Sequence, residues 1–205
     1  MRRTTLGLLT AGALLAAPLL GGCSFLSGSD DAASAQPGAT STAPVGGAES
    51  GEQRTIGPLD IMAADYWYAK APKGGITHVT ARGCEDGKPC PGFDIITGDA
   101  VTQAVGDDGT TAYLPKGTKC PGKDALTPSV SGDHEPTVTK TVVAGSEATR
   151  SEIVLACVDD DGNVGLTTTQ IQWYVPNSPE GPVLVVDRWA FDGLDARLAA
   201  ATWAG

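Results

Sequence analysis

The pattern of apolar and polar side chains in the second half of the chain predicts β-strands. Residues 137–144 are rich in threonine and valine, which have high β propensity. Residues 153–158 form a short apolar run typical of a buried central strand, and residues 164–175 alternate between apolar and polar. The sequence Asp-Asp-Asp-Gly-Asn at 159–163 is a strong turn signal between these two segments. Together they predict a long antiparallel hairpin.

Shorter runs predict further strands. Residues 76–82 and 183–190 are rich in apolar and β-branched side chains. The turn sequence Gly-Asp-Asp-Gly at 106–109 predicts a second hairpin, which joins residues 100–105 to residues 110–114.

Helices are expected at the two ends of the folded region. Pro58 suits the first turn of a helix that runs to about Lys70. Asp192 can cap a C-terminal helix, and Phe191 before it can pack on the first turns as a hydrophobic staple. The apolar residues on one face of this helix are Leu194, Leu198 and Ala201. We therefore expect an α+β domain dominated by an antiparallel sheet with N- and C-terminal helices. An all-β sandwich with a peripheral C-terminal helix is the alternative.

The first 23 residues have the pattern of an export signal. Two arginines after Met1 are followed by an apolar run at residues 6–20, which Pro18 interrupts. As a helix this run would span about 22 Å, less than the hydrocarbon core of about 30 Å. The sequence Leu-Gly-Gly-Cys at 20–23 resembles the lipobox of bacterial lipoproteins. The resemblance implies that residues 1–22 are a signal peptide and that Cys23 receives a diacylglycerol thioether.

A lipid on Cys23 would hold the protein on the extracytoplasmic face of the cell membrane, because two acyl chains give a stable anchor. Residues 23–55 are poor in large apolar side chains, so they cannot offset the entropy lost on ordering and are expected to form a disordered tether. A flexible coil of this length spans roughly 30 Å. Residues 56–205 are then expected to form a single disulfide-stabilised domain.

The cysteines fit an exported protein. Besides Cys23 there are four, an even number that suggests two disulfides with three possible pairings: Cys84, Cys90, Cys120 and Cys157. We favour pairing the first with the second and the third with the fourth. Zinc ligands are usually two to four residues apart, and this spacing is absent, so no metal site is expected.

Charge and motifs exclude several functions. The formal net charge is −10, and loss of Arg2 and Arg3 with the leader would make it −12, which disfavours nucleic acid as a partner. The chain has two histidines, His78 and His134, and lacks the common hydrolase, zinc-protease and nucleotide-binding motifs. No cofactor is expected. The turn at 159–163 lacks the first and last ligands of a calcium loop, so it indicates a solvated turn.

Three consecutive aromatic residues are the candidate binding site. Tyr66, Trp67 and Tyr68 cannot all face one core, so at least one ring should be partly exposed or covered by another element. An exposed tyrosine or tryptophan ring suits a binding surface. The sequence favours a lipid-anchored, non-enzymatic domain that binds a protein, peptide or glycan of the cell envelope. One alternative is an envelope hydrolase, with a cleft near His78 or His134. The other is a lipoprotein that captures a small molecule or metal in an enclosed pocket.

Overall fold

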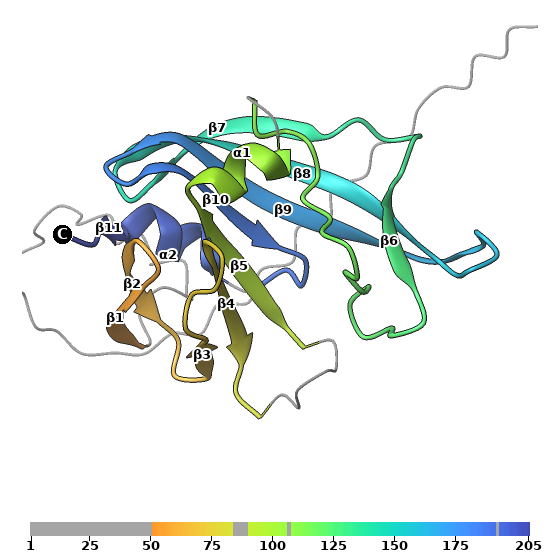
Figure 1. The fold of residues 1–205 in the computed structure, drawn as a ribbon, viewed down its shortest axis with the longest axis horizontal. Coiled ribbons are helices and arrows are strands. Elements are labelled where there is room, and N and C mark those ends of the chain that lie inside the picture. Colours follow the sequence, from red (N-terminus) through yellow and green to blue (C-terminus); the bar gives the residue numbers. More distant parts are fainter. Residues whose placement is uncertain (1–50, 84–89, 106–107, 192) are drawn as a thin grey trace, which may run out of the picture. The chain divides into compact units, whose positions relative to one another are not determined.

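The long hairpin predicted from the sequence is the centre of the fold. The computed structural model describes residues 51–83, 90–105, 108–191 and 193–205. The hairpin consists of β8 (Ser146–Val158) and β9 (Val164–Ser178), which pair antiparallel (Figure 1). In the turn between them, the carboxylate of Asp159 accepts hydrogen bonds from the backbone N–H groups of Asp161 and Asn163, at 3.0 and 2.8 Å. The predicted hairpin and its turn are therefore confirmed.

Within the described residues the hairpin belongs to an eight-stranded antiparallel sheet, which confirms that this sheet type dominates the fold. The strand order is β3 (Trp67–Ala69), β4 (Ile76–Ala81), β5 (Gly92–Thr97), β10 (Gly181–Asp187), β9, β8 and β6 (Thr127–Val130). The eighth strand, β7 (Thr137–Val143), pairs with the first half of β8. The strands predicted at 76–82, 137–144 and 183–190 are thus present with small differences in their ends.

A smaller sheet and a helix cover one face of the large sheet. The small sheet has the order β1 (Glu52–Ile56), β2 (Leu59–Ala63) and β11 (Thr202–Trp203), and the helix is α2 (Leu194–Ala200). Trp67 and Trp173 are the largest fully buried side chains in this layer. We call this side of the large sheet, which carries Trp173 and Val185, the α2 face.

The opposite side, which we call the α1 face, carries Ile96 and Leu184. It is covered by α1 (Asp99–Val105), which buries Val101 and Val105 against these residues. The segment after α1 crosses the same face, where Tyr113 packs against the same cluster. The large sheet therefore has an apolar layer on both sides, as expected for strands such as β5 and β10 that are apolar on both faces.

The predicted N-terminal helix at 58–70 is wrong, because this segment forms β2 and β3. Pro58 lies instead in the tight turn between β1 and β2, where Gly57 has φ 59° and Ile56 pairs with Leu59. Burial in β2 alternates with period two, with Leu59 and Ile61 both fully buried. β1 begins at Glu52, inside the range 23–55 that the sequence assigns to the tether.

The predicted hairpin between residues 100–105 and 110–114 is also wrong. The first segment is α1, in which Val101 and Val105 lie four residues apart on the buried face. The second segment forms no strand, and the side chain of Gln172 holds it in place. The Nε2 group of Gln172 donates to the carbonyls of Gly109 and Thr111, both at 2.8 Å, and its Oε1 accepts from the N–H of Tyr113 at 3.3 Å.

The predicted C-terminal helix is confirmed as α2. Asp192, the expected capping residue, lies outside the described residues; the helix starts after Gly193 (φ 72°), and the N–H of Leu194 donates to the carbonyl of Phe191. Phe191 itself packs against the core of the α2 face, in contact with the ring of Trp67.

Gly109 offers a test of the α1-side packing. Its φ is +70°, and a Cβ added there would lie 2.3 Å from the Cβ and Cγ atoms of Tyr174. Because these atoms are near the backbone, Tyr174 cannot move aside cheaply, and we expect Gly109→Ala to lower the free energy of unfolding by about 3 kcal/mol. Gly74→Ala is the matched control, since its φ is +59° with no atom within 4 Å. It should cost only about 1 kcal/mol. Equal losses in urea denaturation would show that no clash occurs at Gly109.

Candidate functional site

A polar cluster lies on the α1 face, on β4 and β5 and just after the end of β10. His78 on β4 is the direct cross-strand partner of Asp94 on β5, so the two side chains stand on the same face. Asp94 is also aligned with Val186 on β10. Arg188 follows two residues after Val186, which brings its side chain to the same face and the next position along. The antiparallel register thus assembles the three residues from distant parts of the sequence.

Asp94 is the centre of this cluster. One carboxylate oxygen is 2.5 Å from His78 Nδ1, and the other accepts a hydrogen bond from Arg188 Nη1 at 3.3 Å. Because a carboxylate only accepts, Nδ1 of His78 carries the hydrogen. This hydrogen bond raises the pKa of His78 above its ordinary 6.5, against the opposing effect of burial. His78 remains 51% exposed, whereas Asp94 is only 15% exposed.

Arg188 is held from several sides. Its side chain is 13% exposed, its Nη2 donates to the carbonyl of Tyr113 at 2.7 Å, and its guanidinium carbon lies 5.6 Å from the centre of the Tyr113 ring. Its Nε is buried and has no hydrogen-bond partner among the residues that the structure describes. Each terminal nitrogen of Arg188 therefore already donates a hydrogen bond within the protein.

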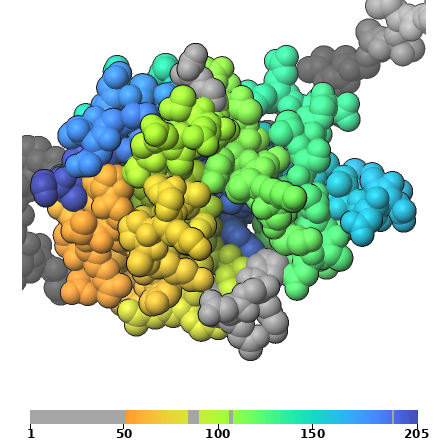
Figure 2. All heavy atoms as spheres, viewed as in Figure 1, coloured from red at the N-terminus to blue at the C-terminus, as the bar shows by residue number. Residues whose placement is uncertain are grey.

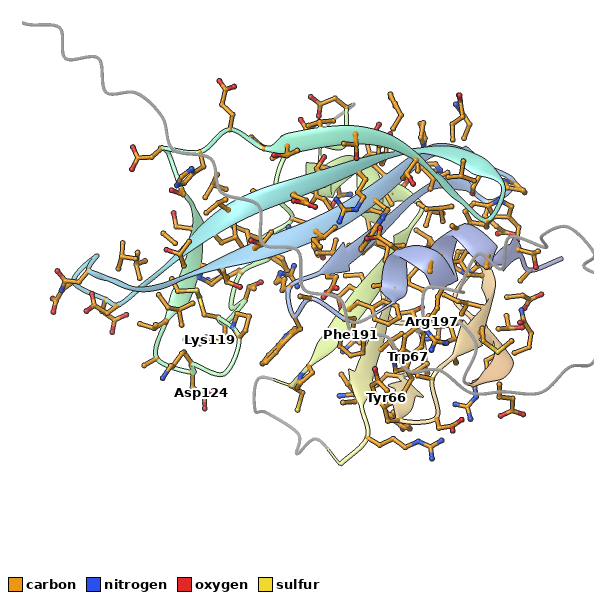
Figure 3. All side chains as sticks on the ribbon, turned by 180° about the vertical axis from the view of Figure 1, so that it is seen from behind. Tyr66, Trp67, Lys119, Asp124, Phe191 and Arg197 are labelled. Atoms are coloured by element: carbon orange, nitrogen blue, oxygen red, sulfur yellow. A yellow bond between two sulfur atoms is a disulfide. The ribbon has the colours of Figure 1, made fainter. Side chains whose placement is uncertain are left out.

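The cluster forms the wall of a cleft of about 460 Å³. The opposite wall is the loop at residues 115–119, which contributes the exposed Lys116 and Lys119 together with Asp124 from the turn that follows. Figure 2 shows this hollow between the yellow-green and green segments, with blue atoms of the C-terminal third at its base. In Figure 3, Lys119 and Asp124 project from the loop that precedes β6. The volume is in the range of small-molecule sites.

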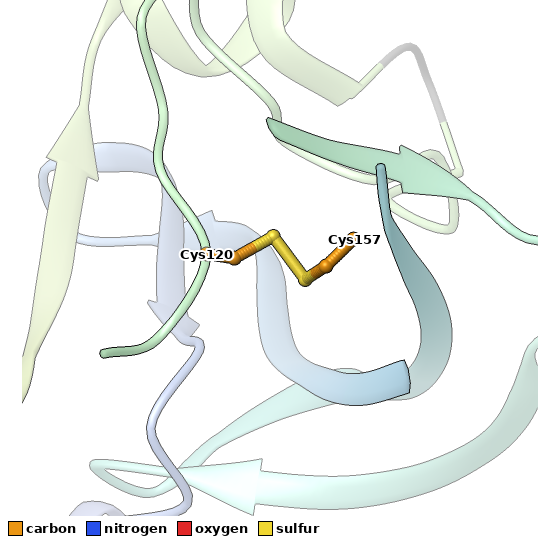
Figure 4. Close-up of a disulfide and its surroundings, with 2 residues drawn as sticks. All are labelled: Cys120 and Cys157. Atoms are coloured by element: carbon orange, nitrogen blue, oxygen red, sulfur yellow. A yellow bond between two sulfur atoms is a disulfide. The ribbon is translucent and has the colours of Figure 1, made fainter. Parts of the chain in front are cut away.

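The loop that carries the lysines is fixed at both ends. At its start, the N–H and hydroxyl of Thr118 both donate to the carbonyl of Pro115, at 3.0 and 2.7 Å. At its end, Cys120 forms a disulfide with Cys157 on β8 (Figure 4). The predicted pairing of these two cysteines is confirmed. Cys90 lines the cleft and is also disulfide-bonded; its predicted partner Cys84 lies outside the described residues.

A second carboxylate, that of the buried Asp187, holds the turn that carries Trp189. Asp187 is 1% exposed and accepts hydrogen bonds from the N–H groups of Trp189 and Phe191, at 2.8 and 2.7 Å. Burial raises the pKa of Asp187 above its ordinary value, although these hydrogen bonds oppose the rise. The turn that Asp187 caps includes Ala190, at φ 52°, and places the half-buried Trp189 in the cleft lining.

The predicted aromatic site lies elsewhere. Tyr66 and Tyr68 are exposed, and Trp67 between them is 1% exposed. Figure 3 shows Tyr66, Trp67, Phe191 and Arg197 as one group beside α2, where Tyr66 stacks on Phe191 and Arg197 lies over Trp67. These aromatic residues are not part of the cleft lining. Cys23, the predicted lipidation site, lies outside the described residues.

In the ranges that the structure describes, no group of three or more histidine, cysteine or acidic side chains is arranged to hold a metal ion. In the acidic turn, the carboxylate of Asp159 accepts hydrogen bonds from the backbone N–H and the side-chain amide of Asn163. These hydrogen bonds lower the pKa of Asp159. No described helix is long and apolar enough to span a membrane.

Sequence reasoning found only part of this site. His78 was a candidate as one of two histidines, whereas His134 lies in an exposed loop and is not in the cleft lining. The sequence does not indicate the other polar residues of the cleft, because no motif links them: Asp94, Arg188, Lys116 and Lys119. A prediction that paired 76–82 with 92–97 would have placed His78 opposite Asp94.

The pairing of His78 with Asp94 predicts a pH-dependent stability. Because the folded state raises the pKa of His78, the stabilisation is fully present below pH 6.5 and is lost as the pH rises through the raised pKa. We expect the difference in unfolding free energy between the wild type and His78→Ala to be constant below about pH 6.5 and to shrink as the pH rises above it. Urea denaturation at a series of pH values measures this difference. When Asp94 is replaced by asparagine, the difference that His78→Ala makes should no longer depend on pH. If the pH dependence persists, a group other than the pair of His78 and Asp94 causes it.

The chain matches no protein-family model, and comparison with the curated proteins and with the solved structures finds no match either.

Proposed function

We propose that the chain is a lipid-anchored protein of the bacterial cell envelope whose folded domain binds a ligand in the cleft between His78 and Lys119. Cys23 in its lipobox-like sequence would carry the anchor, and residues 1–22 would be removed. The cysteines agree with this location, since disulfides persist outside the cytosol. The domain would then face the extracytoplasmic side of the membrane.

The cleft is the observation that carries the proposal. A volume of about 460 Å³ suits a small molecule or a short piece of a glycan or peptide better than a protein surface. The polar groups of the cleft come from β4, from β5, from Arg188 after β10 and from residues 115–119, which we call the lysine loop. The disulfide and the turn at Thr118 hold this loop in place. Such preorganisation lowers the entropy lost on binding.

A hydrolase is the second candidate, and the pair of His78 and Asp94 is what favours it. A histidine whose Nδ1 is held by a carboxylate can act as a general base through Nε2. The hydroxyl group that lines the cleft, that of Thr118, donates to Pro115 and is not paired with His78. Binding therefore fits the cleft better than nucleophilic catalysis does.

The test is a thermal-shift screen of the full chain with neutral, carboxylated and phosphorylated sugars and with short cell-wall peptides. We expect at least one class to raise the melting temperature, and the shift to be lost in Trp189→Ala. Tyr68→Ala, an exposed aromatic residue outside the cleft lining, is the matched control and should keep the shift. A shift that depends on Tyr68 and not on Trp189 would move the site to the predicted aromatic group. Turnover of a bound compound would favour the hydrolase.

A further inference from the structure

The charges of the cleft are opposite to those of the chain as a whole. The chain has 24 acidic and 14 basic residues. The cleft is lined by three basic residues (Lys116, Lys119 and Arg188), two acidic ones (Asp94 and Asp124) and His78. Asp94 is already shared between Arg188 and His78, so it serves as their internal counter-ion. The exposed Lys116 and Lys119 outnumber the remaining acidic residue, Asp124, so the rest of the cleft can still attract an anion.

The kinds of cation present distinguish between two anions. The two parallel N–H groups of an arginine match a carboxylate and also two oxygens of a phosphate. In Arg188 one terminal nitrogen already donates to Asp94 and the other to the carbonyl of Tyr113, and Nε is buried, so either anion would have to share these nitrogens. Lysine ammonium groups act as point charges and bind the several oxygens of a phosphate from different directions. With Nδ1 of His78 committed to Asp94, Nε2 is the ring nitrogen that a ligand in the cleft can reach.

We infer that the ligand carries a phosphate ester group, which binds between Lys116, Lys119 and His78 while its organic part lies against Trp189. This inference depends on the proposed function, because it names the ligand class of the same cleft. The flat indole of Trp189 provides an apolar wall suited to a sugar or another small organic group. The shared chemistry is the phosphate ester, whether it comes from a soluble compound or from a lipid headgroup.

Binding should strengthen as the pH falls. The groups acting on His78 are Asp94, which raises its pKa, and Lys70 and Arg188, which lower it. Once His78 is protonated, both of its ring nitrogens are donors, so Nε2 can donate to a phosphate oxygen. The affinity should also fall with added salt, because Lys116 and Lys119 are exposed and screened.

The experiment is isothermal titration calorimetry of the full chain with glycerol 3-phosphate, glucose 6-phosphate, glucuronate and glucose. A parallel arm measures binding to phosphatidylglycerol vesicles and to phosphatidylcholine vesicles. We expect a phosphate ester to bind in at least one arm, and binding to weaken at least about tenfold in Lys116→Ala/Lys119→Ala. Lys73→Ala/Lys140→Ala removes the same charge outside the cleft lining and should bind as the wild type does. The arm that responds identifies the source of the phosphate.

Four results would overturn the inference. Glucuronate binding as tightly as the phosphate esters would show that the cleft selects carboxylates. Equal weakening in the two double-lysine variants would show that only net charge matters. If phosphate esters fail in both arms while another class in the thermal-shift screen binds through Trp189, the proposed function stands and the phosphate assignment falls. If nothing binds through the cleft in either experiment, both are wrong.

Discussion

Replacing Asp94 by alanine should lower the free energy of unfolding by about 3 kcal/mol. The reason is that Arg188, only 13% exposed, would keep its charge in a largely buried site and lose its acidic partner. His78 would lose the hydrogen bond that raises its pKa. Urea denaturation of the wild type and the variant at constant pH measures the loss.

A double-mutant cycle separates this pairing from general damage to the strand. If the ion pair between Asp94 and Arg188 is responsible, then the losses from Asp94→Ala and Arg188→Ala should not add, and the coupling energy should be about 1–3 kcal/mol. Asp94→Asn keeps the shape and one acceptor oxygen, so it should cost less than alanine. Additive losses in the cycle would mean that Asp94 and Arg188 contribute independently.

Removing the disulfide between Cys120 and Cys157 should have an effect of similar size. The two cysteines are 37 residues apart, and in the loop-entropy model a cross-link of this span stabilises the fold by about 4 kcal/mol. The bond also joins the end of the lysine loop to β8. We therefore expect Cys120→Ala/Cys157→Ala to lower the unfolding free energy by this amount and to weaken ligand binding through Lys119.

The two effects of this change can be measured separately. Equilibrium unfolding reports the stability, and titration at a temperature where the variant is folded reports the binding. Leu198→Ala, which is expected to destabilise the fold from the core of the α2 face and is not in the cleft lining, is the control. A disulfide variant that binds as tightly as the Leu198 variant would show that the bond does not position the lysine loop.

The strands that were predicted correctly from the sequence are those with strong local signals. The hairpin of β8 and β9 has both a period-two pattern and an acidic turn. The failures occurred where a long-range contact decided the outcome. Pro58 is compatible with a helix start, but pairing of β2 with β1 and β11 makes its segment a strand. Residues 110–114 resemble a strand, but Gln172 binds their backbone instead.

Most of the candidate site could not be predicted from local sequence patterns, because long-range contacts decide it as well. His78, Asp94 and Arg188 meet because β4, β5 and β10 are neighbours in one register, which no nearby residue specifies. The lysine loop reaches them because of a disulfide that was one of three possible pairings. The exposure of a ring in the sequence Tyr66-Trp67-Tyr68 could be predicted from side-chain direction alone.

The most direct measurement is nuclear magnetic resonance of the two imidazole rings during a titration with glycerol 3-phosphate. The chain has only two histidines, so His134, which is not in the cleft lining, serves as the internal reference for His78. The account predicts that the signals of His78 shift on binding, that its pKa rises further, and that both changes are lost in Lys116→Ala/Lys119→Ala. Signals of His78 that move no more than those of His134 would contradict an anion site in this cleft.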